Sequence, residues 1–216
     1  MIKAVIFDMD GLMINSEGIS FQCYQDIITS YGYPFTKEDY LQGFPGRSAL
    51  ASLTYIKNHY HLDFDLDVMV KHFFELEQKY LNQNGVSLKN GLIELLEYLK
   101  KHQYKTIIAT SSTKVRAKQL LGNHDVLKYF DDMICGDEIS RSKPDPEIFI
   151  KAAQKLQVKN SEALVLEDSE AGIAAANKAG ISVICIPDLK YPQKEYLDQC
   201  KVFDSLDEVI NFLKNL

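Results

Sequence analysis

Residues 3–12 have the sequence KAVIFDMDGL. The run from Ala4 to Phe7 is apolar without interruption, which is typical of a strand buried on both faces of a parallel sheet. The turn-forming sequence DMDG then ends this run. The stretch predicts a buried first strand that leads straight into a loop carrying two carboxylates, Asp8 and Asp10.

The rest of the chain repeats this pattern. Apolar runs of strand length alternate with segments in which apolar residues recur at helical spacing. Such alternation predicts crossover units and a parallel sheet with helices on both faces, which is an α/β fold. The further strands are expected at 105–110, 132–136, 162–168, 181–186 and 201–203, and the helices at 90–102, 112–124, 146–158, 169–180 and 205–216.

The stretch 16–83 differs from the rest because it shows helical patterns without a convincing strand. We expect a core domain made of 1–15 and 84–216, with an all-helical domain of 16–83 inserted after the first strand. Ligands of open α/β sheets bind beyond the carboxyl ends of the strands. An insertion that leaves the first strand at that end is expected to act as a lid, or cap, over the site.

Composition limits the classes of function. The chain has 216 residues, 46% hydrophobic and 25% charged, with a net charge of −6. This profile is that of a globular protein, and the negative charge disfavours binding to nucleic acid or to an anionic membrane. No apolar stretch is long enough to span a membrane, and the first residues do not resemble a signal peptide. The four scattered cysteines favour neither a disulfide framework nor a cysteine metal site, so a cytoplasmic protein is expected.

The two carboxylates that follow the first strand suit phosphoryl transfer. Asp8 and Asp10 are expected to face the same crevice, where one carboxylate can attack phosphorus as a nucleophile. The other can protonate the leaving oxygen and later deprotonate the attacking water. A pair of solvated aspartates in a turn is the alternative for D-x-D taken alone.

Hydroxyl groups follow the second strand. Residues 110–113 have the sequence TSST and open a predicted helix. Hydroxyls and free N–H groups at a helix N-terminus form a ready phosphate site, although an ordinary helix cap would have the same sequence.

Lys143 lies in the sequence SKPDP, residues 142–146. Pro144 biases Lys143 toward an extended conformation, and Asp145 is expected to cap a helix whose first residue is Pro146. A stiff segment of this kind would aim one ammonium group at a phosphate and a carboxylate. A surface lysine before a helix is the alternative.

Glu167 and Asp168 end the strand predicted at 162–168. Two adjacent acids there would lie near Asp8 and Asp10, and a pair of like charges about 4 Å apart costs roughly 4 kcal/mol at an effective dielectric of 20. A divalent cation removes this repulsion, and ligands that are all oxygen favour Mg²⁺ over Zn²⁺. A solvated acidic edge is the alternative.

The four segments together resemble the motifs of the haloacid dehalogenase superfamily, and most of all its β-phosphoglucomutase and sugar-phosphate phosphatase branch. The resemblance covers essentially the whole chain. It rests on FDMDGLMINSE (7–17), IIATSS (107–112), SKPDPEIF (142–149) and LVLEDSEAGIAAANKAG (164–180). It implies a Rossmann-like, doubly wound parallel sheet with a small helical cap inserted after the first strand.

The resemblance also implies roles for individual residues. Asp8 resembles the nucleophile that forms an aspartyl-phosphate, and Asp10 the general acid and base. Lys143 resembles the cation that stabilises the nucleophile and the transferred phosphoryl group. Ser111, with the backbone of Ser112, resembles the phosphate-holding motif.

A magnesium site is implied in the same way. Asp8, the backbone carbonyl of Asp10 and Asp168 resemble the metal ligands, with Glu167 a direct or water-mediated ligand. In the cap, the loop GFPGR (43–47) ends in Arg47, which is a candidate for gripping the substrate. An exposed arginine at a helix start is the alternative for that residue.

The sequence departs from the family at two positions. Asn15 stands where an aspartate is usual at the hinge into the cap, which puts lid behaviour in doubt. Ser20 lies near the position where β-phosphoglucomutases carry a histidine in the first cap helix. Loss of that acid/base group favours hydrolysis over transfer to a second sugar hydroxyl.

The expected function is therefore a Mg²⁺-dependent phosphatase of a small phosphorylated metabolite, such as a sugar or polyol phosphate. A β-phosphoglucomutase is the alternative. A metal-free dehalogenase fits less well, because displacing halide needs no divalent cation. A non-catalytic receiver module fits less well. Its phospho-acceptor is expected on a strand in the middle of the chain, without a helical cap, whereas Asp8 follows the first strand. The expected partner is the metabolite alone, without nucleic acid or membrane, and the expected assembly is a monomer or weak homodimer.

Overall fold

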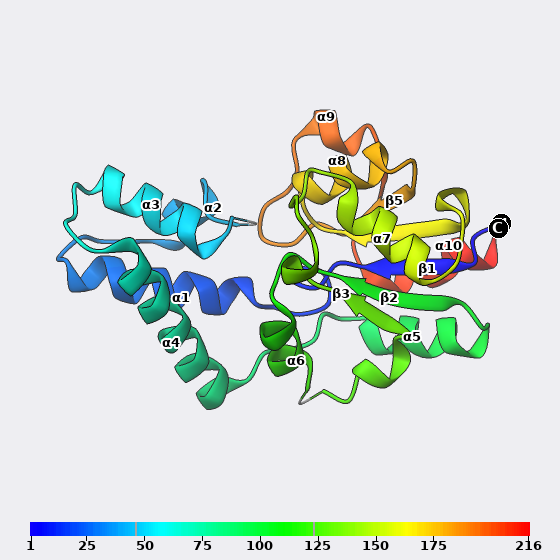
Figure 1. Ribbon diagram of the computed structural model, residues 1–216, viewed down its shortest axis with the longest axis horizontal. Helices are drawn as coiled ribbons and strands as arrows, with labels where there is room; N and C mark the ends of the chain where they lie inside the picture. Colours follow the sequence, from blue (N-terminus) through cyan, green and yellow to red (C-terminus); the bar gives the residue numbers. More distant parts are fainter. Residues whose placement is uncertain (46, 123) are drawn as a thin grey trace. The chain divides into compact units, whose positions relative to one another are not determined.

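The computed structural model describes residues 1–45, 47–122 and 124–216, which form two compact units (Figure 1). We call Met1–Asn15 with Leu88–Leu216 the core unit and Ser16–Ser87 the helical unit. The core unit resumes at Leu88, whereas the sequence placed its return at residue 84. The helix before this point continues to Asn84, and Leu88 then forms an antiparallel bridge to Ile14, so the chain rejoins the core unit there.

The core unit contains one six-stranded sheet in which every pairing is parallel. The strand order is β3-β2-β1-β4-β5-β6, which confirms the expected doubly wound α/β fold. All six strands lie within or at the predicted apolar runs. Their bounds are β1 Ala4–Phe7, β2 Lys105–Ala109, β3 Asp132–Ile134, β4 Ala163–Glu167, β5 Ser182–Cys185 and β6 Lys201–Val202.

Strand β1 occupies the middle of the sheet because its apolar side chains need cover on both faces. All four of its residues are buried, and it pairs with β2 on one edge and β4 on the other. The chain keeps this alignment one residue further, since the backbone N–H of Asp8 donates to the carbonyl of Leu166 at 3.0 Å. Asp8 therefore emerges between the carboxyl ends of two neighbouring strands.

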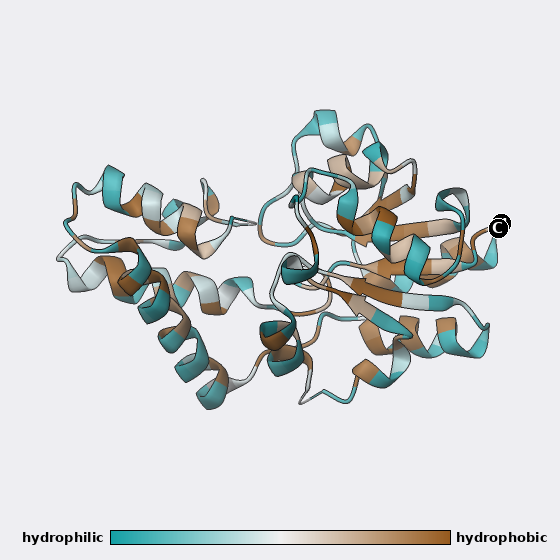
Figure 2. Ribbon diagram, in the orientation of Figure 1, coloured by the Kyte–Doolittle hydropathy of each residue, from teal (hydrophilic) through white to brown (hydrophobic). Residues whose placement is uncertain are grey.

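Helices cover the sheet. Successive side chains of a strand point to opposite faces, and on one face Ala4 and Ile6 belong to a buried cluster with residues of α7 and α8. Helix α5 packs on β2 and on α10. In Figure 2 the strands are largely hydrophobic, whereas the helices carry hydrophilic residues as well. The helices are α5 Leu92–Lys101, α6 Lys114–Gly122, α7 Glu147–Lys155, α8 Glu170–Lys178, α9 Lys194–Leu197 and α10 Leu206–Lys214.

Among its described residues, the core unit also contains three single turns of 3-10 helix, η1 Leu127–Tyr129, η2 Gly136–Glu138 and η3 Asn160–Glu162. Of these, η2 follows β3 at the carboxyl ends of the strands, where Asp8 also lies. No helix in the described ranges has the length and apolar character needed to cross a membrane.

The helical unit has its own hydrophobic core. Its described residues form four helices without a strand, in line with the helical patterns of the sequence. The core is rich in aromatic side chains, and Tyr24, for example, stacks on Phe73 with ring centroids 4.7 Å apart. The helices are α1 Glu17–Ser30, α2 Lys37–Leu41, α3 Ala49–His59 and α4 Leu66–Asn84. Gly46, part of the expected substrate loop, lies outside the described residues.

Candidate active site

A buried lysine joins two of the predicted acidic residues. The ammonium of Lys143 contacts Oδ1 of Asp8 and lies 2.6 Å from Oε1 of Glu167. The side chain of Lys143 is only 6% exposed. Asp8 follows β1, Glu167 is the last residue of β4, and Lys143 precedes α7. The fold thus brings together residues that are 135 and 24 positions apart in the sequence.

The segment that carries Lys143 is a turn, with a cis peptide bond between Lys143 and Pro144. The backbone N–H of Asp145 donates to the carbonyl of Ser142 at 3.0 Å and closes the turn around Lys143 and Pro144. The carboxylate of Asp145 accepts the N–H of Glu147 at 3.0 Å. Asp145 therefore accepts the first N–H of α7, as the sequence indicates, but the helix begins at Glu147 with Pro146 as its N-cap, one residue later than expected.

The connection between β4 and α8 is folded around the carboxylate of Glu167. Its Oε2 accepts the backbone N–H groups of Asp168 and Ser169, at 2.9 and 2.8 Å, and the hydroxyl of Ser169 at 2.9 Å. The same hydroxyl accepts the N–H of Gly172 and caps α8. A Cβ at Gly172 would collide with the Glu167 carboxylate. Glu167 therefore bonds to the helix start through one oxygen and to Lys143 through the other.

Asp168 completes an acidic group that is able to hold a cation. Oxygen atoms of Asp8, Glu167 and Asp168 lie within 4.8 Å of one another. Gly11 lies against this group with φ +80°, and a Cβ there would collide with Oδ2 of Asp168. A set of donors made only of oxygen fits a hard cation such as Mg²⁺. The residues present therefore suit the ion that the sequence implies.

Burial and charge act on Asp8 in opposite directions. The pKa of Asp8 is raised to about 7 as the net result: burial raises it most, the Lys143 ammonium lowers it, and the charge of Glu167 raises it. Burial also opposes ionisation of Glu167, but Lys143 and the hydrogen bonds from Ser169 outweigh it and hold the pKa of Glu167 below its usual range. Lys143 keeps a raised pKa despite burial, because Asp8 and Glu167 both face it. Lys143 is therefore a fixed positive charge.

The structure adds one residue that the sequence reasoning missed. Nη1 of Arg116 donates to both carboxylate oxygens of Asp10, at 2.9 and 3.0 Å, and to the hydroxyl of Ser112 at 2.5 Å. The Ser112 hydroxyl in turn donates to Oδ2 of Asp10 at 2.8 Å. Two contacts thus fix the carboxylate expected to act as general acid and base.

A weak signal for Arg116 was present in the sequence. In the helix predicted at 112–124, Arg116 lies four residues after Ser112, so both would fall on one face. A cation in the first turn of a helix is also unfavourable unless an anion is near. The carboxylate of Asp10 provides that anion. The sequence alone does not reveal this pairing because Asp10 is 106 positions away.

The two serines expected to hold phosphate take different positions. Ser111 is exposed, whereas Ser112 is half-buried and uses its hydroxyl on Asp10. The N–H of Ser112 donates to the hydroxyl of Thr110 at 3.1 Å, so the chain turns sharply after β2. A Cβ at Gly136 would collide with the carbonyl of Ser111. The loop that follows β3 therefore packs closely against the backbone of this turn.

Arg47 belongs to the helical unit, where its side chain is exposed and its guanidinium lies 5.6 Å from the ring centre of Tyr55. A cation–π contact of this kind is enough to hold an arginine at a surface. The role of Arg47 toward substrate stays a prediction.

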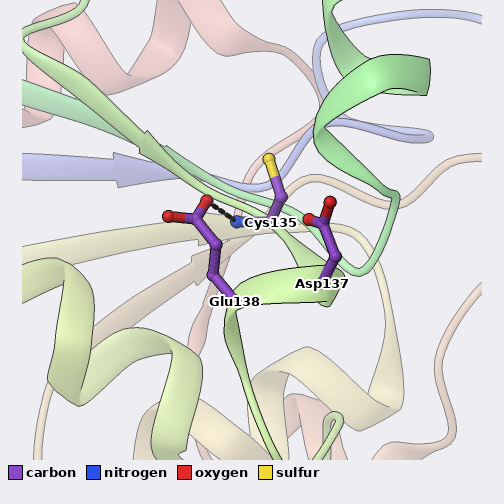
Figure 3. A group of neighbouring side chains, drawn as sticks. All are labelled: Cys135, Asp137 and Glu138. Atoms are coloured by element: carbon purple, nitrogen blue, oxygen red, sulfur yellow. Dashed lines mark hydrogen bonds between the residues drawn. The ribbon is translucent and has the colours of Figure 1, made fainter.

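Figure 3 shows a second group of side chains with metal-ligating atoms, formed by Cys135, Asp137 and Glu138. Glu138 accepts the N–H of Cys135 at 3.1 Å, and Asp137 accepts the N–H of Lys114 at 3.2 Å. Burial and the two neighbouring carboxylates raise the pKa of the Cys135 thiol to about 11. A protonated thiol is a poor ligand, and the carboxylates stabilise the backbone of η2 and α6.

Comparison with known proteins decides the family. Residues 5–186 match the model of the haloacid dehalogenase-like hydrolases. The chain belongs to this family. The resemblance seen in the sequence is therefore confirmed, and so is the assignment of the chain to an enzyme fold with hydrolase chemistry.

Several of the relatives that match are named as phosphatases. A phosphorylated carbohydrates phosphatase of Thermotoga maritima is 35% identical over 159 residues, which cover 73% of this chain and 72% of that protein. Validoxylamine A 7'-phosphate phosphatase of Streptomyces hygroscopicus is 31% identical over 163 residues, 74% of each chain. The expected enzyme class, a phosphoric monoester hydrolase, agrees with these relatives.

A solved structure resembles the whole chain. The crystal structure of a putative β-phosphoglucomutase from Thermotoga maritima has a TM-score of 0.83, 29% identity and full coverage of both chains. A crystal structure of CbbY from Rhodobacter sphaeroides, with a TM-score of 0.83, is 22% identical and supports the fold alone.

Proposed function

We propose that the protein hydrolyses a small phosphorylated metabolite, a sugar or polyol phosphate, by transferring the phosphoryl group to Asp8 and then to water. The observation that carries the proposal is the buried Lys143, whose ammonium joins Asp8 to Glu167 beside Asp168. A permanent positive charge at a carboxylate nucleophile stabilises the negative charge that gathers on the phosphoryl group during transfer. The names of the phosphatase relatives support the same substrate class.

In the first step the carboxylate of Asp8 attacks phosphorus and the bond to the leaving oxygen breaks. Asp10 donates a proton to that oxygen, so the product leaves as an alcohol. In the second step Asp10 accepts a proton from water, which attacks the phosphorus of the aspartyl-phosphate and frees inorganic phosphate. Lys143 holds the phosphoryl oxygens in both steps, with help from Ser111 and the backbone of Ser112.

Asp8, Asp168 and the backbone carbonyl of Asp10 would hold Mg²⁺, which supplies charge neutralisation at the phosphoryl group. Glu167 is assigned to positioning, because its two oxygens already bond to Lys143 and to the start of α8. Its pKa below the usual range keeps this carboxylate charged and the lysine in place. We propose the helical unit, residues 16–87, as the cap that sets substrate choice.

The experiment is a panel of sugar, polyol and nucleoside phosphates, with and without Mg²⁺, monitored for inorganic phosphate. We expect Mg²⁺-dependent release from at least one sugar or polyol phosphate, and none from a folded Asp8→Asn variant. Asp8→Asn removes the nucleophile and leaves the shape of the side chain unchanged. Turnover retained by that variant would overturn the mechanism.

A β-phosphoglucomutase is the second candidate, favoured by the structural likeness to a protein described as a putative member of that class. Ser20 stands near the position where the sequence pattern of the mutases has a histidine, and serine is a poor acid and base at neutral pH. Conversion of β-glucose 1-phosphate to the 6-phosphate, without matching phosphate release, would establish the mutase instead.

A further inference from the structure

Asp188 carries a carboxylate oxygen without a visible partner. Its side chain is 10% exposed, and Oδ1 pairs with the ammonium of Lys89 at 2.5 Å. The other oxygen, Oδ2, is buried and has no hydrogen-bond partner among residues 1–45, 47–122 and 124–216. Buried polar atoms are nearly always satisfied, so an orphan of this kind indicates a missing donor.

The orphaned oxygen faces the candidate metal site. A Cβ built on Gly11 would lie 3.4 Å from Oδ2 of Asp188 and would collide with Oδ2 of Asp168. Oδ2 of Asp168 and Oδ2 of Asp188 therefore both lie on the side of Gly11 where a Cβ would be. An ionised carboxylate only accepts hydrogen bonds, so the buried Oδ2 of Asp188 requires a donor or a cation beside Gly11.

The backbone holds Asp188 and Lys89 firmly in this place. Asp188 follows the end of β5, where the N–H of Ile186 donates to the carbonyl of Glu167 at 2.7 Å. The N–H of Lys89 donates to the carbonyl of Met13 at 2.9 Å. Both residues are thus tied to the loops that carry the predicted metal ligands.

We propose that Asp188 is an outer-sphere residue of the magnesium site. Its Oδ2 accepts a hydrogen bond from a water ligand of the cation held by Asp8 and Asp168, and Lys89 fixes the carboxylate through Oδ1. Mg²⁺ gives up its waters reluctantly and usually keeps several. Mutation of a carboxylate that holds such an outer ligand typically weakens metal affinity by about 10–100-fold. This assignment rests on the metal site of the proposed function.

The test is the affinity of the metal-free protein for Mg²⁺, measured by calorimetry. For Asp188→Asn we expect about 10–100-fold weaker binding than for the wild-type protein. Asp188→Glu keeps the charge and moves the oxygen, so we expect weaker binding there as well. It also serves if Asp188→Asn does not fold, since it keeps a negative charge beside the Lys89 ammonium.

Glu162→Gln is the matched control. Glu162 also pairs with a lysine, Lys3, at 2.6 Å, but at the amino ends of β1 and β4, opposite the site. The substitution removes one negative charge, as Asp188→Asn does, and we expect the Mg²⁺ affinity to stay unchanged. Thermal unfolding of each metal-free variant reports on the stability of the fold separately.

The outcomes separate the two proposals. If both Asp188 variants bind Mg²⁺ as the Glu162→Gln variant does, the pair of Asp188 and Lys89 is only a structural ion pair and the inference is wrong. The same holds if only Asp188→Asn binds more weakly, because charge alone then explains the effect. If the wild-type protein does not bind Mg²⁺ at all, the metal site itself fails, and with it the inference.

Discussion

The carboxylate of Asp8, the proposed nucleophile, is costly to ionise in the metal-free fold. Burial raises the pKa of Asp8 to about 7, although Lys143 contacts it. An ionised Asp8 therefore destabilises the metal-free fold at neutral pH. A divalent cation beside the carboxylate favours its charged form, so metal binding and readiness for nucleophilic attack are expected to coincide.

This cost can be measured with Asp8→Asn in the absence of metal. Between the ordinary value of 3.8 and about 7, folded Asp8 keeps a proton that the unfolded chain has released. The stability contributed by this residue therefore falls as the pH rises through that window. The amide has no proton to lose, so we expect the variant to exceed the wild type in stability at pH 8 and to lose this advantage toward pH 4.

Urea unfolding at several pH values, with a chelator present, measures the difference. Saturating Mg²⁺ is the control, because it stabilises the wild-type protein and should remove or reverse the gap at pH 8. A gap that widens toward low pH would contradict the expected direction of this pH dependence.

Arg116 is a positioning residue for Asp10 in the proposed reaction. Arg116→Gln removes the contact to both carboxylate oxygens of Asp10, so the acid/base group loses its fixed position. Since small misplacements of a catalytic group can cost up to about 100-fold in rate, we expect a roughly 10- to 100-fold lower kcat with little change in KM. Steady-state kinetics on the best substrate measures both constants.

Lys118→Gln provides the matched control for Arg116. Lys118 is an exposed cation on the same helix, α6, so the variant loses the same charge without touching Asp10. We expect it to behave as the wild type. A higher KM with unchanged kcat in Arg116→Gln would instead mean that the guanidinium binds substrate.

The connection from β4 to α8 works as one element, because a single carboxylate organises it. Glu167 accepts N–H groups from Asp168 and Ser169 while it holds Lys143 through its other oxygen. The start of a helix is favourable for a negative charge. The geometry of α8 is thus transmitted to the lysine on a different loop.

Gly172 tests this coupling. A Cβ on Gly172 would collide with the Glu167 carboxylate, so Gly172→Ala must displace the carboxylate or the helix. We expect the variant to lose about 1–3 kcal/mol of stability, as overpacked sites do. We also expect lower activity, because a displaced Glu167 carboxylate no longer holds Lys143 in position. Denaturant unfolding and kinetics measure the two losses.

Gly122→Ala is the control on another helix. Space around Gly122 in α6 is open, and its backbone does not adopt a left-handed conformation. Such a change is expected to be neutral or to stabilise by about 0.4–1 kcal/mol. Equal losses in both variants would show that glycine in a helix, and not the contact with Glu167, sets the effect.

At the scale of elements, the sequence predicts what depends on local pattern and misses what depends on the reach of side chains. The apolar runs locate all six strands, and the rule that ligands bind at strand ends predicts that Asp8, Lys143 and Asp168 meet. The role of Arg116 is not predicted, because its partner Asp10 is distant in the sequence. The turn at Lys143 is not predicted either, because the hydrogen bond from the N–H of Asp145 to the carbonyl of Ser142 has no signature in the local sequence pattern.

The whole molecule consists of two units with separate hydrophobic cores. The core unit buries its apolar residues on the sheet, and the helical unit buries an aromatic cluster among its own helices. The proposed chemistry lies entirely in the core unit, whereas the candidate Arg47 lies in the helical unit. Stability of one unit is therefore expected to be separable from the chemistry of the other.

Leu53→Ala and Leu95→Ala test this separation. Both side chains are fully buried, Leu53 in α3 of the helical unit and Leu95 in α5 of the core unit. Leucine-to-alanine changes in a core cost about 2–5 kcal/mol. We expect Leu53→Ala to speed amide hydrogen exchange in α1, α3 and α4 while the protection of β1 and the affinity for Mg²⁺ stay as in the wild type. Leu95→Ala should do the reverse, and faster exchange throughout the chain in both variants would mean that the two cores unfold as a single cooperative unit.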